Sequence, residues 1–407
     1  MDKIGVGWAF VSETGKRLVN EMLDTNRLSQ GPMVRKFEKE FARLHEQKYG
    51  IALNSGTSAL HVGLEAMKEK FNWHANSKVL VPAVTFIASS NACLHAGLVP
   101  VFVDVDSKTY NINPNLIEEK IDSDTVAIMP VHLFGQPCEM EPIVALAKKY
   151  NLKIIEDCAE AHFATYKNQP VGSFGDVAGF STYVAHTITT GVGGVVTTND
   201  RELMEISRSL IAHGRACTCE ECVASNPKKV CPLRMQTATD KRFTFLRIGY
   251  SYRIGEFEGA IGLDQLEHKD FIMNTRKANA KYLTENLQDV QDFFQLPWYP
   301  EYVDHSFMMY PLVVKKNAPF AREDITRWLE KNNIETRPML PLLNQPIYKK
   351  FFGDLEKDYP VAEWIDRRGF YVGCHHGLQK VQLDKIIECV HEFVRVKVIR
   401  GGGVYNK

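Results

Sequence analysis

Small hydroxyl residues and a pair of acids follow two apolar stretches of the sequence, at positions where parallel strands would end. The first group, Asn54-Ser55-Gly56-Thr57-Ser58, opens a helical pattern, so its N–H groups and hydroxyls could converge on a phosphate at a helix N-terminus. A Ser or Thr that caps the helix without a ligand explains the same residues. The second group, Glu156-Asp157, ends the run KIIED, where an acid can pair with a protonated ring nitrogen or serve as a turn residue. Each group can therefore be explained either by ligand binding or by a local structural role alone.

A third group lies between two later apolar stretches. It contains Ser181 and His186 and is followed by the glycine-rich loop Gly191-Val192-Gly193-Gly194. An imidazole has a pKa near neutral and can act as a general base, although a lone histidine in a folded protein is usually structural. The role of His186 therefore depends on the pattern around it.

A fourth group consists of cysteines. Four of the nine cysteines fall within fifteen residues of one another, at Cys217, Cys219, Cys222 and Cys231. In a reducing compartment such a cluster favours a metal centre over disulfides, and an iron–sulfur cluster and a structural zinc fit the spacing equally well. Thiols without a metal are the remaining interpretation.

The composition excludes several classes of protein. The chain has 407 residues, with 49 Lys and Arg against 49 Asp and Glu, so no net charge attracts nucleic acid or an anionic membrane surface. No apolar run has the length needed to cross a bilayer, and the N-terminal segment is unlike a signal peptide. We expect a cytoplasmic enzyme with two domains.

Strand and helix patterns alternate through the first part of the chain. Buried strands are predicted at 79–82, 101–105, 126–131, 153–155, 178–181 and 194–198, and helices at 58–70, 88–96, 114–119 and 140–150. The later elements are a long helix, a strand, a helix and a strand, predicted at 256–286, 309–314, 321–332 and 334–338. The alternation predicts an α/β fold with a mostly parallel sheet covered by helices, followed by a smaller α+β part.

The long helical pattern suggests where the chain divides. We place the boundary within 264–269, between a large α/β domain (1–265) with a cysteine-rich insert at 216–232 and a small C-terminal α+β domain (266–407). In open α/β sheets ligands bind at the carboxyl ends of the strands, where the first three chemical groups lie.

In this order, the groups resemble the sugar aminotransferases and dehydratases of the DegT/DnrJ/EryC1/StrS family, which are fold-type I pyridoxal phosphate enzymes. The resemblance covers nearly the whole chain, through SQGPMVRKFEKEFA, LNSGTSALHVGL, VPAVTFIASSNA, PVFVDVD, MPVHLFGQ, IIEDCAEAH, GSFGD, the 180–198 segment, GYSYRIGEFEGAIGLDQL and VGCHHGL. It implies a homodimer whose active sites form at the subunit interface.

The resemblance also assigns roles around a pyridoxal or pyridoxamine 5′-phosphate coenzyme. The residues that would hold the coenzyme phosphate are Gly56, Thr57 and Ser181. Ser251 replaces the Asn that family members commonly send into the neighbouring subunit's phosphate site.

Other residues would contact the coenzyme ring or the substrate. By the resemblance, Phe86 would stack on the ring, Asp157 would protonate its nitrogen, and Glu160 falls where members have Gln or Asp near the ring hydroxyl. Residues placed as possible sugar or nucleotide contacts, although their types more commonly form ion pairs, are Arg253, Arg337 and His375 or His376.

His186 stands where the aminotransferases of the family have the lysine that holds the coenzyme covalently. The stretch 169–240 has lysine at Lys228 and Lys229 alone, within the cysteine-rich insert, so ordinary transamination is disfavoured. The resemblance places histidine at this point in the deoxysugar 3-dehydratases. In these enzymes, pyridoxamine phosphate would condense with a nucleotide-linked 4-keto-6-deoxyhexose, and the imidazole would remove a proton so that the C3 hydroxyl leaves.

The cysteine insert narrows the resemblance to one subgroup, the CDP-6-deoxyhexulose 3-dehydratases. These carry a C-x-C pair and a later Cys that hold a 2Fe-2S cluster, and here Cys217, Cys219 and Cys231 match. Either Cys158 or Cys222 would complete the set. The cluster would pass electrons singly from a reductase, because net C3 deoxygenation consumes two electrons.

Four departures from the family pattern leave alternatives open; they are Val192 for Glu, Ser251 for Asn, Thr187 for a second His, and Phe163 for Gly. One alternative is a cluster-free dehydratase of the GDP-sugar type, in which the thiols hold structural zinc. Another is a catalytically silent relative that binds a sugar nucleotide.

Overall fold

A seven-stranded sheet forms the centre of the computed structural model, which describes residues 3–219, 231 and 239–399. Its strands, in spatial order, are β1 (Tyr49–Leu53), β9 (Gly194–Thr198), β8 (Val177–Ser181), β5 (Lys153–Asp157), β4 (Thr125–Ile128), β2 (Lys78–Pro82) and β3 (Val99–Val103). From β8 to β3 neighbouring strands pair in parallel, whereas β9 is antiparallel to both β1 and β8. The predicted α/β class and mostly parallel sheet are confirmed.

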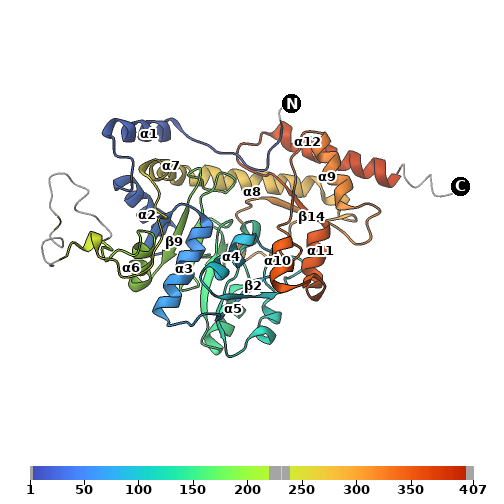
Figure 1. Cartoon of the computed structure of the whole chain (residues 1–407). Helices are drawn as coiled ribbons and strands as arrows, with labels where there is room; N and C mark the ends of the chain where they lie inside the picture. The colour runs from blue at the N-terminus through green and yellow to red at the C-terminus, as the bar shows by residue number, and fades with distance from the viewer. Residues whose placement is uncertain (1–2, 220–230, 232–238, 400–407) are drawn as a thin grey trace.

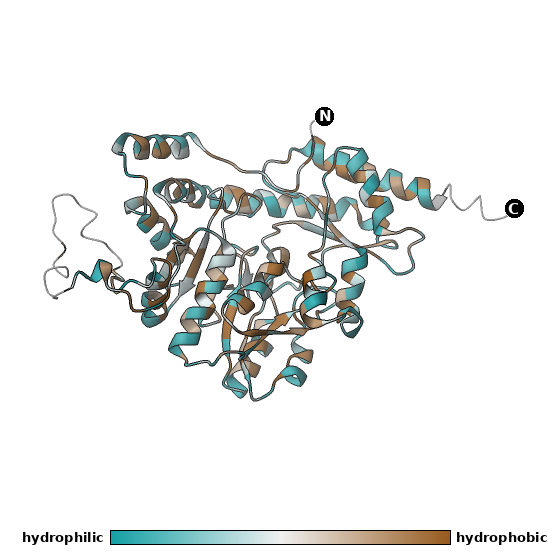
Figure 2. Cartoon of the chain, in the orientation of Figure 1, coloured by the Kyte–Doolittle hydropathy of each residue, from teal (hydrophilic) through white to brown (hydrophobic). Residues whose placement is uncertain are grey.

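The strands are buried and the helices that cover them expose a polar face, as the hydropathy colours of Figure 2 show. Helix α3 (Gly56–Lys70) packs on β8 and β9, and α4 (Ile87–His95) packs on β2 and β3; both lie in front of the sheet in Figure 1. The further helices of this part are α1 (Glu13–Thr25), α2 (Pro32–Leu44), α5 (Met140–Lys149) and α6 (Arg201–Leu210). The sheet therefore has the helical cover that a parallel sheet requires.

The C-terminal part contains a smaller antiparallel sheet. Its strands, in spatial order, are β10 (Phe294–Gln295), β12 (Tyr310–Val314), β14 (Gly369–Val372) and β13 (Arg337–Pro338). Its helices are α8 (Lys269–Asn286), α9 (Arg322–Lys331), α10 (Pro346–Phe352), α11 (Pro360–Arg368) and α12 (Lys380–Val394). A third sheet consists of β11 (Val303–Asp304), β6 (Thr165–Tyr166) and β7 (Gln169–Pro170). None of the helices in the described ranges has both the length and the apolar character needed to cross a bilayer.

Three predicted elements differ from the structure. The predicted helix at 114–119 is two single 3-10 turns, Pro114–Leu116 and Glu118–Lys120, because the Asn113 side chain and Pro114 favour a short turn. The predicted strand at 334–338 shortens to Arg337–Pro338, and Ile334 instead forms an isolated bridge with Ile4 near the N-terminus.

The predicted helix at 256–286 is two helices that meet at His268. Helix α7 (Glu256–Glu267) ends there, and the His268 imidazole donates from Nδ1 to the carbonyl of Asp264 at 2.8 Å, a carbonyl that also accepts the His268 backbone N–H at 3.2 Å. The break lies inside the range 264–269, where the sequence suggests a domain boundary.

Candidate active site

A cavity of about 550 Å³ lies at the carboxyl ends of the parallel strands, where the α/β arrangement leaves room for a ligand. It brings together seven of the eight residues predicted to serve catalysis or the coenzyme, which are Gly56, Thr57, Phe86, Asp157, Glu160, Ser181 and His186. The eighth, Ser251, is exposed, pairs through its backbone with Ala212 and is not among the residues that line this cavity. A contact from Ser251 to a neighbouring subunit stays a prediction.

The N-terminus of α3 forms one wall of the cavity. Ser55 caps the helix by accepting the N–H of Ser58 at 3.0 Å, so the N–H groups of Gly56 and Thr57 have no acceptor within the helix. Gly56 approaches β8 so closely that a Cβ atom at this position would lie 2.5 Å from the Cβ of Ser181. The result is a cradle of small groups and free donors that suits a phosphate.

Asp157 occupies the end of β5 and is buried at the floor of the cavity. Its carboxylate accepts a hydrogen bond from the hydroxyl of Ser89 at 2.7 Å and from the backbone N–H of Ala159 at 3.1 Å. Because the Ser89 hydroxyl donates to Asp157, the 2.7 Å contact between Ser89 and Thr85 is a bond donated by Thr85. Burial raises the pKa of Asp157, and a protonated ring nitrogen would supply the positive charge that this carboxyl lacks.

Phe86 begins α4 on the opposite side. Although it lines a cavity, its side chain is 57% exposed, which is unusual for a phenylalanine in the body of a protein. A flat ring bound above Asp157 would cover the exposed face of the Phe86 side chain.

The His186 ring contacts the backbone of Ala159 and of Ser181. Its Nδ1 lies 2.5 Å from the carbonyl oxygen of Ala159, and since a carbonyl can only accept, Nδ1 carries the proton. The lone pair of the neutral ring is therefore on Nε2. Burial lowers the pKa of His186 to about 4, so the ring is neutral and can accept a proton at pH 7.

Glu160 provides a second group whose pKa is shifted toward neutrality. Its carboxylate accepts the backbone N–H of Phe134 at 2.7 Å, and Phe134 adopts a left-handed conformation, with φ of 57°, that presents this N–H. Burial, opposed by this hydrogen bond and reinforced by the nearby charge of Asp157, raises the pKa of Glu160 to about 7.

Several lining residues were missed by sequence reasoning or weighed only as sugar contacts. Tyr183 lines the cavity from the segment that carries Ser181 and His186, although it was assigned no role, and Tyr371 comes from β14, far away in the sequence. Arg337 also lines it and pairs with Glu335. Of the other sugar-contact candidates, Arg253 lines a different cavity, and His375 and His376 are buried without lining this one.

The cysteines of the insert are only partly within the described residues. Cys217, Cys219 and Cys231 are half-buried, whereas Cys222 lies outside the described residues. Across the part of the chain that the structure describes, one group of three metal-ligating side chains has all its ligand atoms within 4.8 Å, and it does not include these cysteines.

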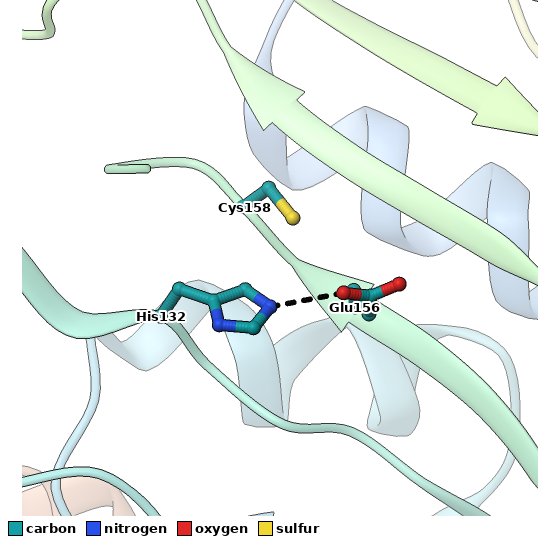
Figure 3. A group of neighbouring side chains, drawn as sticks. All are labelled: His132, Glu156 and Cys158. Atoms are coloured by element: carbon teal, nitrogen blue, oxygen red, sulfur yellow. Dashed lines mark hydrogen bonds and ion pairs between the residues drawn. The ribbon is translucent and has the colours of Figure 1, made fainter. Parts of the chain in front are cut away.

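That group is His132, Glu156 and Cys158, at the end of β5 (Figure 3). The Glu156 carboxylate already accepts an N–H at 2.8 Å from each of three backbone groups, those of Gly172, Phe174 and Gly175. The His132 Nδ1 accepts the N–H of Cys138 at 3.0 Å, so its Nε2 carries the proton and donates to Glu156 at 3.1 Å. Since the lone pairs that a metal would need are occupied, this group is an anchor for the strand that carries Asp157. Cys158, one candidate for a fourth cluster ligand, belongs to this buried group.

A phosphate cradle, an exposed aromatic ring and a buried acid at the carboxyl edge of such a sheet define a class, the fold-type I pyridoxal phosphate-dependent transferases. Within that class, the sequence profile of the DegT/DnrJ/EryC1/StrS aminotransferase family matches residues 11–391. The chain belongs to this family.

Relatives with assigned activities include transferases and dehydratases. GDP-perosamine synthase of Escherichia coli O157:H7 is 35% identical over 93% of this chain and 95% of its own length. The dTDP-4-dehydro-2,6-dideoxy-D-glucose 3-dehydratase of Saccharopolyspora spinosa is 31% identical over 90% of this chain and 81% of its own. A solved structure of a GDP-4-keto-6-deoxymannose-3-dehydratase, a His-to-Asn variant with bound GDP-perosamine, superposes with a TM-score of 0.86 at 25% identity, covering 95% and 100% of the two chains.

Proposed function

We propose that this protein catalyses the pyridoxamine phosphate-dependent removal of the C3 hydroxyl from a nucleotide-linked 4-keto-6-deoxyhexose. The observation that carries the proposal is His186, which lines a cavity that has no lysine among its described residues and whose Nδ1 donates to the Ala159 carbonyl. A family member without the lysine amine lacks the usual covalent hold on the coenzyme, whereas an imidazole base suits a dehydration.

The coenzyme fits the residues of the cavity. The N–H groups of Gly56 and Thr57 and the hydroxyl of Ser181 would hold its phosphate, Phe86 would cover its ring, and Asp157 would pair with its nitrogen. When bound, pyridoxamine phosphate supplies an amine and an electron-accepting ring.

Two side chains of the protein would carry out the proton transfers. Nε2 of His186 accepts a proton and returns it, while the Ala159 carbonyl keeps the ring in the correct tautomer. Glu160, which burial holds near its titration point at neutral pH, would contact the ring hydroxyl and can carry a proton at its carboxyl.

The proposal extends to an iron–sulfur cluster and a reductase that supplies its electrons. Cys217, Cys219 and Cys231 offer three thiols, and either Cys158, which is buried at the end of β5, or Cys222 would supply the fourth. Thiol chemistry suits iron or zinc, while the described sulfurs are not all brought within 4.8 Å of one another. The observation that supports the cluster is therefore the C-x-C spacing of the cysteines. A homodimer and a cytoplasmic location complete the proposal.

Anaerobic purification with a visible spectrum, together with iron, zinc and acid-labile sulfide analysis before and after addition of pyridoxamine phosphate, tests both cofactors. We expect a brown protein that contains iron and sulfide and binds the coenzyme. A protein that binds neither pyridoxal nor pyridoxamine phosphate would refute the reaction itself, whatever its metal content.

A second candidate is a cluster-free dehydratase of the GDP-sugar type with structural zinc. It is favoured by the similarity to the GDP-4-keto-6-deoxymannose-3-dehydratase structure. A colourless protein with stoichiometric zinc and intact coenzyme binding would select it. A catalytically silent, sugar-nucleotide-binding relative is the third candidate, and a pathway assay unchanged by His186→Ala would select that.

A further inference from the structure

One arginine of the C-terminal part is buried without a carboxylate beside it. Arg276, on α8, is the largest of the described side chains that are almost completely buried, with 1% of its surface exposed. Burial lowers its pKa, and no ion pair joins it to a carboxylate in the part of the chain that the structure describes. A buried charge without a partner of opposite charge lowers stability, so an arginine here requires a role that an apolar side chain could not fill.

The Arg276 guanidinium holds a backbone turn, residues 306–308, which we call the C-terminal turn. Its Nη1 donates to the carbonyl of Met308 at 2.9 Å and to that of Phe307 at 3.3 Å, whereas Nε and Nη2 have no acceptor among the described residues. Phe307 adopts a left-handed conformation, with φ of 48°, which a bulky residue keeps only where its surroundings impose it. Arg276 therefore helps to fix the C-terminal turn.

The C-terminal turn packs against the 3-10 turn Leu133–Gly135. The backbone N–H of Ser306 donates to the Gly135 carbonyl at 2.9 Å. The N–H of Met308 donates to the Phe134 carbonyl, also at 2.9 Å. A Cβ atom at Gly135 would lie 2.2 Å from the Ser306 hydroxyl oxygen, so the two turns are in direct contact. Their contact belongs to the wall of the coenzyme cavity, which Leu133 and Met308 both line.

The 3-10 turn in turn orients an acid of the coenzyme cavity. Phe134 presents its N–H to the Glu160 carboxylate at 2.7 Å, while its carbonyl accepts the N–H of Met308. A continuous series of hydrogen bonds therefore leads from Arg276 through these two backbone groups to Glu160. Hydrogen bonds in series polarise and orient one another, so loss of the first member would loosen the last.

We propose that Arg276 is a positioning residue of the coenzyme cavity, which acts through the two turns to hold the Glu160 carboxylate in place. The guanidinium contacts neither coenzyme nor substrate, because Arg276 does not line the cavity. Its effect on turnover rests on the proposed function, whereas its effect on coenzyme affinity depends only on coenzyme binding.

A double-mutant cycle with Arg276→Met and Glu160→Gln tests the proposal, measured on the full-length protein by absorbance titration with pyridoxamine phosphate. We expect each single variant to raise the coenzyme Kd about three- to tenfold, since one hydrogen bond contributes roughly this factor. The double variant should bind no more weakly than the weaker single variant, because both changes interrupt one series of contacts. Additive effects would overturn the proposal, as would an unchanged Kd in Arg276→Met.

A matched control lies about one turn further along α8. Asn279 is also buried and donates to the carbonyls of Cys374 and His375, neither of which lines the coenzyme cavity. Asn279→Ala should lower Tm and leave the coenzyme Kd unchanged. A Kd raised equally by Asn279→Ala and Arg276→Met would overturn the proposal, because a general loss of stability would then explain both.

Two further variants of Arg276 separate positioning from misfolding. Arg276→Lys retains a charged donor and should restore part of the affinity that Arg276→Met loses. Arg276→Gln keeps a polar but shorter side chain. If Arg276→Met does not fold, Arg276→Gln takes its place in the cycle, and an unchanged Kd or additivity with Glu160→Gln overturns the proposal in the same way.

Turnover of a nucleotide-linked 4-keto-6-deoxyhexose, measured in the same variants, distinguishes this proposal from the proposed function. Wild-type protein that binds the coenzyme without converting the sugar would refute the reaction, while the cycle on coenzyme Kd would still decide the role of Arg276. A protein that binds no coenzyme would overturn both.

Discussion

Two cavities of this protein, the coenzyme cavity and the one that Arg253 lines, have nearly the same volume, about 550 and 540 Å³, but opposite electrostatic character. In the first, burial moves the pKa of His186 down to about 4 and that of Glu160 up to about 7, so at pH 7 the imidazole is neutral and the Glu160 carboxyl is near its titration point. In the second, the charged groups are mainly guanidinium ions, which do not lose their proton in proteins. The first cavity therefore contains groups that can transfer protons, whereas the second contains fixed positive charges.

The comparison also shows how each cavity keeps its shape. Asp157 and His186 are oriented by hydrogen bonds to Ser89 and to the Ala159 carbonyl, and β5 is anchored by the Glu156 and His132 pair. The walls of the second cavity are joined by isolated backbone bridges instead. Replacing a group in the first cavity should therefore change either turnover or the affinity for the coenzyme, depending on whether the group moves a proton or holds the ring.

The largest effect is expected from His186→Ala. Removing the general base should lower turnover of a nucleotide-linked 4-keto-6-deoxyhexose about 10²- to 10⁴-fold, while binding of pyridoxamine phosphate changes little. Single-turnover assays and absorbance titrations measure the two quantities. His74→Ala, at an exposed histidine whose ring contacts only the neighbouring Ala75 carbonyl, serves as the control. Turnover equal to wild type would remove His186 from the reaction.

Asp157→Asn should weaken the binding of the coenzyme. A neutral amide cannot offer a negative charge to the ring nitrogen, so the coenzyme Kd should rise about 10- to 100-fold, the range expected for a charged hydrogen bond. Ser89→Ala removes one of the two bonds that orient Asp157 and should have a smaller effect in the same direction. A Kd unaffected by Asp157→Asn would show that the ring nitrogen lies elsewhere.

The sequence predicted the first cavity better than the second for a physical reason. Gly56, Asp157 and His186 follow strands of a parallel sheet, and the carboxyl ends of such strands meet at one edge, so local pattern was enough to place them together. Arg35, Arg215 and Arg253 come from segments with no common period, and their neighbourhood depends on isolated bridges such as Arg215 to Phe245. Because the numbers of basic and acidic residues in the chain are equal, the composition gave no indication of this group of arginines.

The prediction of helices and strands has the same limit, because it uses local pattern alone. The helical periodicity of 256–286 was correct on both sides of His268, but it does not reveal that one helix ends and another begins at this residue. Similarly, Tyr371 enters the first cavity from the C-terminal sheet, through packing that no local motif specifies.

The smallest predicted effect concerns Glu160 and the pH dependence of stability. The carboxyl of Glu160 keeps its proton up to about pH 7 in the folded protein, whereas its ordinary pKa is 4.5. Between these pH values the folded state binds more protons than the unfolded state, so this group makes stability fall as the pH rises. Glu160→Gln does not titrate and should gain stability relative to wild type from pH 5 to pH 8, by about 1–3 °C in Tm. Because burial lowers the pKa of His186, its contribution to stability rises with pH and is common to both proteins, so the difference in Tm isolates Glu160. A difference in Tm that stays constant over this range would mean that Glu160 is already ionised at pH 5, and the proton that we assign to its carboxyl at neutral pH would have to come from another group.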